Sequence, residues 1–217
     1  MDFTVRQIQN EKERVVCGME EAFPSSRLQG YTALLRAKLS KKRFTHSMNV
    51  AESAKELAQR WMVDADWAYL AGLLHDICKE LSYEEQSELM QSALPPAGAE
   101  EWECKPVWHG IAAESYLRME LGIENQDVLH AVRFHTVGRA GMSRLEEVIY
   151  MADLISADRT YRDVEHFRKL AMTDLERAMF EAMQYSIDSS LRKGNLIVSQ
   201  TMEAYNHYLR IMNQRKK

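Results

Sequence analysis

Three separate stretches of the chain carry side chains that could hold a metal ion. They contain His46, the adjacent pair His75 and Asp76, and Asp153. Imidazole and carboxylate ligands without a thiolate suit iron, manganese, zinc or magnesium, and a cation held by such ligands can activate water for hydrolysis. These residue types therefore indicate a metal-dependent hydrolytic site, provided that the fold brings the three stretches together.

Each of these residues also has an ordinary structural interpretation. A His-Asp pair at a helix end is commonly solvated, and His46 near a helix start could be a hydrogen-bonded core histidine. Asp153 lies among apolar residues in VIYMADLI, where an ionised carboxylate is costly unless a partner compensates it. Arg133 or Arg159 could be that partner instead of a metal ion. The metal-site interpretation depends on the whole set of residues.

Two further histidines could face the same site. His109 in PVWHGIAAE lies about one turn inside a helix start, and His135 ends VLHAVRFHTVG. Both could equally be histidines at helix ends without a ligand. The remaining histidines of the chain fit no pattern and are interpreted as surface or packing residues: His130, His166 and His207.

The stretches around these residues have the periodicity of helices. In residues 65–81 the apolar side chains recur every three and four positions, and Gly72 would let a neighbouring helix approach closely. Ser82, Ser143 and Thr173 each precede a glutamate by three residues, which predicts capped helix starts. Asn125 is a further cap, and Gly194 a helix end. Other helices are predicted over residues 30–40, 43–63, 106–121 and 200–214.

Composition bounds the class of protein. The chain has 217 residues, 46% of them hydrophobic and 28% charged, which is typical of globular domains. A formal charge of −4 offers no general basic field for nucleic acid. The three cysteines are odd in number and form no CxxC pair, which favours a reducing, cytoplasmic setting. No apolar run is long enough for a membrane span, and the N-terminus lacks a signal peptide's apolar core.

The helical pattern continues from one end of the chain to the other. No strand pattern, repeat or low-complexity segment interrupts it, so we predict an all-α fold with a single domain over residues 30–217. Residues 1–29 are interpreted as an N-terminal helical extension. Exposed apolar residues in such a domain would permit a homodimer.

The order of His46, His75-Asp76 and Asp153 resembles the HD-domain superfamily of metal-dependent phosphohydrolases, which are helical bundles. The resemblance is closest to its bacterial branch of symmetrical diadenosine tetraphosphate hydrolases and covers residues 30–206. The segments that carry it are RFTHSMNVAESAKELA, LAGLLHDICKEL, VWHGIAAE, FHTVGRAGMSRLEEVIYMADLISADR and KLAMTDLERAM.

The resemblance implies a role for each residue of the site. The implied metal ligands are His46, His75, Asp76 and Asp153, and the implied metal is iron, with manganese, zinc or magnesium as alternatives. The implied contacts to the nucleotide phosphates are Arg43, Asp76, His109, His135 and Arg159. Asp76, His109 and His135 are the residues expected to take part in proton transfer or to stabilise the leaving phosphate. His109 and His135 also occupy positions where related enzymes hold a second metal.

The expected reaction is hydrolysis of diadenosine tetraphosphate at its centre, which releases two ADP. Arginine and histidine donors suit the charge that spreads over a transferring phosphoryl group, and a bound metal can lower the pKa of its water toward about 7. One alternative is a nucleotidase or nucleoside triphosphate phosphohydrolase. Another is a non-catalytic helical adaptor stabilised by metal, which would leave the arginines and the two further histidines without a task.

Overall fold

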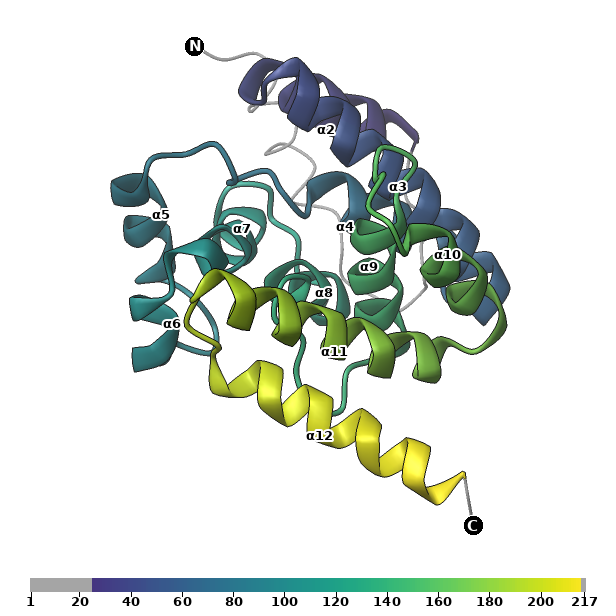
Figure 1. The fold of residues 1–217 in the computed structure, drawn as a ribbon. Coiled ribbons are helices and arrows are strands. Elements are labelled where there is room, and N and C mark those ends of the chain that lie inside the picture. Colours follow the sequence, from purple (N-terminus) through teal and green to yellow (C-terminus); the bar gives the residue numbers. More distant parts are fainter. Residues whose placement is uncertain (1–24, 216–217) are drawn as a thin grey trace.

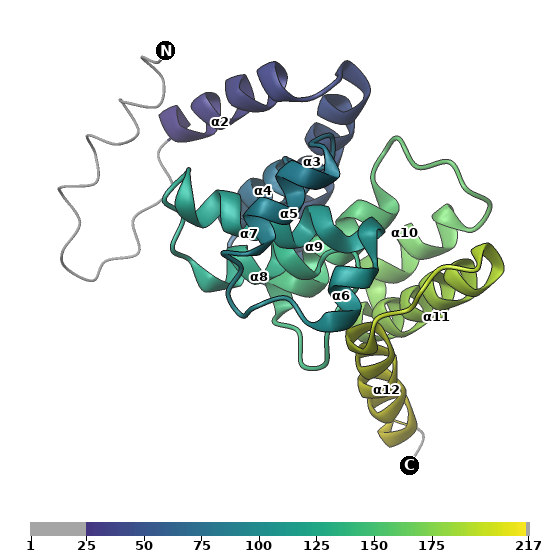
Figure 2. The ribbon, with the colours of Figure 1, turned by 90° about the vertical axis from the view of Figure 1, so that its left-hand side faces the viewer.

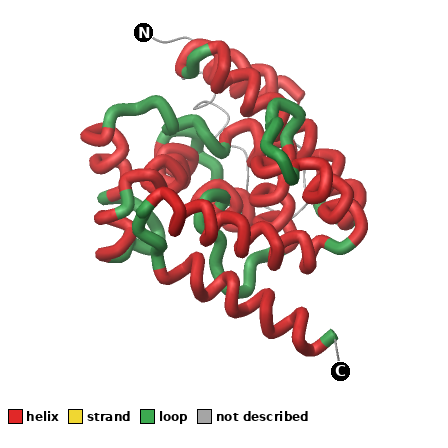
Figure 3. The backbone as a smooth tube through the Cα atoms, in the orientation of Figure 1, coloured by secondary structure: helices red, strands yellow, loops and turns green. Residues whose placement is uncertain are grey.

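The computed structural model describes residues 25–215, and this part of the chain contains helices and no strand (Figure 3). Most of the interpreted N-terminal extension, residues 1–24, lies outside the described residues. The elements are α2 (Ser25–Lys38), α3 (Lys41–Trp61), α4 (Ala65–Leu74), α5 (Tyr83–Met90), α6 (Ala99–Glu103), a 3-10 turn η2 (Lys105–Val107), α7 (Trp108–Met119), α8 (Gln126–Phe134), α9 (Arg144–Ile155), α10 (Val164–Thr173), α11 (Leu175–Lys193) and α12 (Ser199–Gln214).

Most of the predicted helix starts are confirmed by their caps. Ser82 opens α5 and Ser143 opens α9, each with a reciprocal bond to the glutamate three residues later. The side chain of Asn125 accepts hydrogen bonds from the amides of Asp127 and Val128 and so caps α8. These polar side chains satisfy amide groups that a helix start would otherwise leave unpaired.

Several helix boundaries differ from the prediction. Helix α2 begins at Ser25 rather than near Gly30. The start of α11 is capped by Asp174, which accepts a bond from the amide of Arg177, so the predicted cap at Thr173 is wrong. The hydroxyl of Thr173 instead donates to the carbonyl of Lys169 in the preceding helix. Helices α6 and α10 were not identified from the pattern.

The helix that was predicted over residues 65–81 ends at Leu74. Beyond it, the amide of Ile77 donates to the carbonyl of Leu74, and the amide of Lys79 donates to that of Asp76. These bonds span three residues instead of four, so the backbone after α4 winds more tightly than an α-helix and forms successive turns. As a result, His75 and Asp76 lie at the exit of α4, where the backbone turns away from the helix axis.

The core is formed where α3, α4, α8 and α9 pack against one another. Helix α4 approaches α3 very closely, because a Cβ atom on Gly72 would lie 3.0 Å from the Cα of Ala51. The close approach expected at Gly72 is thereby confirmed. Helices α11 and α12 form an outer pair, with α12 extending from the bundle toward the C-terminus (Figures 1 and 2). Within the described range, no helix is both long and apolar enough to cross a membrane.

Candidate metal and phosphate site

The three stretches singled out in the sequence meet in the core. His46 comes from α3, His75 and Asp76 from the exit of α4, and Asp153 from α9. The Nε2 atom of His46 lies 2.9 Å from Oδ1 of Asp153, and Nε2 of His75 lies 3.5 Å from Oδ2 of Asp76. His46, His75 and Asp76 are buried. Residues separated by more than a hundred positions therefore face one small volume.

Three atoms of this cluster are buried without a hydrogen-bond partner: His46 Nε2, His75 Nε2 and Asp76 Oδ1. The short separation between His46 and Asp153 does not have hydrogen-bond geometry, so it leaves the imidazole nitrogen unsatisfied. An unpaired buried polar group costs about 1–3 kcal/mol or more. Three such atoms pointing at one another fit a cation that all of them can coordinate.

The opposite nitrogen of each imidazole is held by a neighbour. Nδ1 of His75 donates to the carbonyl of Gly72 at 2.7 Å, and Nδ1 of His46 lies 2.8 Å from Oδ2 of Asp158. A partner at Nδ1 assigns the proton to that nitrogen and leaves the lone pair of Nε2 free to bind a metal. Asp158 is itself oriented by the side-chain amide of Asn49, whose Nδ2 donates to Oδ1 of Asp158 at 3.1 Å.

The ligand atoms fall into two overlapping groups, each within 4.8 Å of one another. One consists of His46, His75 and Asp153, and the other of His75, Asp76 and His135. The residues present therefore fit one metal ion well. The second group also brings His135 to coordinating distance, as expected if it were a ligand instead of a phosphate contact.

Both carboxylates of the cluster are ionised. Burial alone would raise the pKa of Asp76, but the neighbouring His75, His135 and His109 outweigh it and hold that pKa well below its usual value. For Asp153, burial is likewise outweighed, here by the adjacent imidazole of His46 and by the charges of His75 and Arg159, so its pKa is lowered. Both groups therefore reach neutral pH as anions, the form that binds cations.

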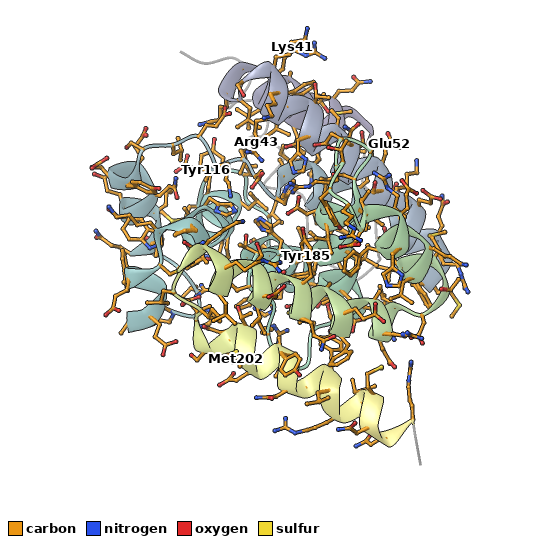
Figure 4. The ribbon with its side chains drawn as sticks, viewed as in Figure 1. Lys41, Arg43, Glu52, Tyr116, Tyr185 and Met202 are labelled. Carbon is orange, nitrogen blue, oxygen red and sulfur yellow. The ribbon has the colours of Figure 1, made fainter. Side chains whose placement is uncertain are left out.

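Two arginines border the carboxylates. Nη1 of Arg43 lies 2.6 Å from Oδ2 of Asp76, and Arg159 pairs with the carboxylate and the main-chain carbonyl of Asp153. Arg43 reaches from α3 toward the middle of the molecule (Figure 4). The competing partner considered for Asp153, Arg133, instead binds the carbonyl of Pro95 and the carboxylate of Glu101.

His109 and His135 lie on the other side of Asp76. Their Nε2 atoms are 3.1 Å apart, and that of His109 is 3.4 Å from Oδ1 of Asp76. Helices α7 and α8 approach closely enough for this because a Cβ on Gly110 would lie 2.7 Å from the carbonyl of Arg133. Burial and the neighbouring Lys79 hold the pKa of His109 well below its usual value, so this imidazole is neutral at pH 7.

The residue ranges that carry this geometry match a known family. The model of the HD domain matches residues 43–158, which begin at Arg43 and end at Asp158. The chain belongs to the HD-domain family. The three remaining histidines lie outside the cluster, as interpreted: His130 contacts the ring of Phe134, His166 pairs with Glu181, and the ring of His207 contacts that of Tyr208.

Several relatives of this HD-domain protein are named symmetrical bis(5'-nucleosyl)-tetraphosphatases. That of Bacillus subtilis is 32% identical over 80% of this chain and 93% of its own length. That of Halalkalibacterium halodurans is 35% identical over 81% of this chain and 94% of its own length. A crystal structure from Clostridium acetobutylicum, described as a predicted HD superfamily hydrolase involved in NAD metabolism, superposes with a TM-score of 0.80 at 33% identity. It covers 87% of this chain and 98% of that one.

Sequence reasoning missed three residues of the HD-domain site. The ammonium of Lys79 lies 3.0 Å from Nε2 of His109, the hydroxyl of Thr136 lies 3.0 Å from Nε2 of His135, and Asp158 holds His46. Lys79 follows Asp76 by one turn, and Thr136 and Asp158 adjoin residues that were already singled out. In the sequence, only their positions next to candidate residues could have indicated that they belong to the site.

Proposed function

We propose that this HD-domain protein hydrolyses diadenosine tetraphosphate at the centre of its phosphate chain and releases two ADP. The observation that carries the proposal is the group of unpaired, buried ligand atoms on His46, His75 and Asp76, bordered by cationic side chains. The names of the relatives from Bacillus subtilis, Halalkalibacterium halodurans and Staphylococcus aureus support a bis(5'-nucleosyl)-tetraphosphate as the substrate class and a symmetrical cut.

The metal ligands would be His46, His75, Asp76 and Asp153. When bound, a metal ion supplies a water that ionises near neutral pH and a positive charge for the phosphate oxygens. We propose iron, and the nitrogen and oxygen donors also suit manganese, zinc or magnesium. Metal analysis of the purified protein distinguishes these ions.

The phosphate chain would lie across the cationic border of the site. Arg43 and Arg159 flank the carboxylates from two sides, and Lys79 adds a third cation next to His109. A transferring phosphoryl group spreads its charge over three oxygens, and guanidinium and ammonium donors stabilise that charge. The arginines pair with Asp76 and Asp153, which keeps them oriented toward the site.

Proton transfer would involve Asp76 and the two histidines. Asp76 is ionised and its Oδ1 atom has no hydrogen-bond partner, so it can accept the proton of the attacking water. Attack at the second phosphorus forms one P–O bond, and the bond from that phosphorus to the bridging oxygen breaks. The departing ADP then carries the bridging oxygen on the third phosphorus. His109, held neutral, can donate a hydrogen bond to this group.

The test is a product analysis with a panel of nucleotides in ¹⁸O-labelled water. Diadenosine tetraphosphate should yield ADP alone, with the label in one of the two ADP molecules of each turnover. AMP plus ATP would show an asymmetric cut and overturn the proposal. The panel includes nucleoside mono- and triphosphates and NAD, the last because of the description of the Clostridium acetobutylicum structure. Turnover of only one of these would favour an HD-domain nucleotidase or another nucleotide hydrolase instead.

A further inference from the structure

The turn that follows α9 carries two residues of the HD-domain site. Asp158 lies 2.8 Å from Nδ1 of His46, and Arg159 pairs with Asp153. Both residues come within four positions of Ile155, the last residue of α9. The shape of this turn therefore decides the direction of one metal ligand and of one proposed phosphate contact.

This turn does not have the common form of a helix end. Many helices end at a glycine in the left-handed conformation, where local amides pair with the last carbonyls. In the described turn over residues 156–159, no residue is a glycine and none adopts that conformation. Ser156 instead has φ −48° and ψ 157°, which directs the chain out of the helix. The last carbonyls of α9 therefore need partners from other parts of the chain.

Arg168 of α10 binds three carbonyls of this region. Its Nε donates to the carbonyl of Ile155 at 2.9 Å, and its Nη2 donates to those of Ser156 at 2.8 Å and Arg159 at 3.1 Å. Helix α10 packs beside α9, so the side chain reaches the turn from the neighbouring helix (Figure 1). One guanidinium thus joins the end of the helix to the far end of the turn and fixes the distance between them.

The guanidinium of Arg168 is itself held in place. Its Nη1 pairs with the carboxylate of Glu165, three residues earlier in α10. The side chain is half-buried, and its positive charge lies at the C-terminal end of α9, where the helix dipole favours a cation. A planar guanidinium directs several donors in fixed directions, which a lysine ammonium does not. The side chain is therefore suited to hold two parts of the backbone in register.

A second arginine binds the end of a helix without contacting the site. Nε of Arg60, an exposed residue of α3, donates to the carbonyl of Met172 at 2.8 Å, close to the end of α10. Its guanidinium also lies over the ring of Trp61. Arg60 makes the same kind of bond as Arg168, but no site residue follows the carbonyl that it binds. It therefore serves as a matched control.

We propose that Arg168 is a positioning residue of the HD-domain site, which fixes the turn over residues 156–159 and so directs Asp158 to His46 and Arg159 to the phosphates. Arg168 acts through these residues and does not touch the reacting atoms. The proposal rests on the proposed function for the roles of His46 and Arg159. A purely structural cap would stabilise the contact between α9 and α10 without changing the site.

The first test measures how firmly the metal-loaded protein holds its metal, by titration with nitrilotriacetate and elemental analysis. Asp158→Ala should lose its metal at about tenfold to a hundredfold lower chelator concentration, because partners of metal-ligating histidines contribute about that much to affinity. Arg168→Ala should lose it at about threefold to tenfold lower concentration, since it acts through Asp158. Arg60→Ala should hold its metal as the unmodified protein does.

Double variants separate positioning from a general loss of stability. If Arg168 acts through Asp158, adding Arg168→Ala to Asp158→Ala should cause no further loss of metal, because changes within one network are not additive. The same comparison applies to pyrophosphate binding by the metal-saturated protein, measured by calorimetry. Arg168→Ala should weaken this binding in the unmodified background and leave it unchanged in the Arg159→Ala background.

Arg168→Lys guards against misfolding of Arg168→Ala, because lysine keeps the positive charge beside Glu165 but has a single nitrogen. This variant should also lose metal more readily than the unmodified protein. Metal retention at the unmodified level in both Arg168 variants would overturn the proposal, as would additive losses in the double variants. An asymmetric cut of diadenosine tetraphosphate by the unmodified protein would overturn the proposed function alone, because neither measurement depends on turnover.

Discussion

Helix α9 carries a buried carboxylate near its start and a half-buried carboxylate near its end, and the two ends provide for them differently. In its first turn, Glu146 accepts bonds from Nε and Nη2 of Arg139 at 2.7 and 2.6 Å and from the amide of Ser143 at 2.7 Å. Toward its last turn, Asp153 faces two imidazole nitrogens that have no hydrogen-bond partner. Asp153 is paired with Arg159, but the imidazole nitrogens beside it have no partner, whereas every group around Glu146 is paired within the chain.

The neighbouring Glu147 follows the first pattern. It accepts a bond from the hydroxyl of Tyr208 at 2.8 Å and one from Nη1 of Arg144 at 2.7 Å. Buried polar groups are normally paired in this way, so the unpaired cluster around His46 and His75 fits a binding site for a cation. The comparison separates a polar cluster that stabilises the fold from one that serves the chemistry.

The sharpest test of this comparison is Asp76→Ala. We expect loss of turnover to the background rate together with reduced metal content, because Asp76 is both a candidate ligand and the candidate proton acceptor. Removing the metal from the unmodified protein with a chelator should also lower its Tm, since binding to the folded state alone stabilises it. Full metal content and an unchanged rate in Asp76→Ala would show that the proposed site is wrong.

The second test separates the metal ligands from the cationic border. Arg43→Ala and Arg159→Ala should each lower kcat/KM by about tenfold to a hundredfold, because a hydrogen bond to a charged group contributes about 1.5–3 kcal/mol. Metal content, measured by elemental analysis, should stay at the level of the unmodified protein. Loss of metal from both variants would mean that the arginines orient the carboxylates and do not bind phosphate.

The third test addresses the paired end of α9. Arg139→Ala leaves Glu146 buried without its two strongest donors, which should lower the free energy of unfolding by about 1–3 kcal/mol. The measurement is urea denaturation, with metal content and turnover at low urea as controls. A variant that lost its metal while remaining stable would contradict the division of α9 into two functional ends.

The smallest expected effect concerns the pH dependence of stability at Glu147. Burial raises the pKa of this carboxyl, although Tyr208 and Arg144 oppose the shift. The folded state therefore holds the proton more tightly than the unfolded state, and the resulting stabilisation is present below about pH 4.5 and lost as the pH rises through the raised pKa. Glu147→Gln should gain stability relative to the unmodified protein over that rise, measured by denaturation at several pH values. If the difference in the free energy of unfolding between Glu147→Gln and the unmodified protein were the same at every pH, Glu147 would not titrate as described.

Local signals in the sequence were sufficient for most of the helical fold. Caps such as Ser82, Asn125 and Ser143 act on amides within three residues, so a short stretch contains the whole interaction. Where two adjacent residues could serve, as with Thr173 and Asp174, the sequence could not decide, because the choice depends on the direction in which the chain leaves α10. The sequence also could not predict where α4 ends, because no residue type marks the change from four-residue to three-residue hydrogen bonds.

The sequence also indicated which residues could do the chemistry, because the order of His46, His75, Asp76 and Asp153 resembles that of the HD-domain superfamily. Only the tertiary structure decided their partners. Asp158 reaches His46 across 112 residues, and Lys79 meets His109 only because the turns after α4 and helix α7 border the same volume. Such contacts depend on how closely helices approach, as at Gly72 and Gly110, and that distance is set by packing of the whole core.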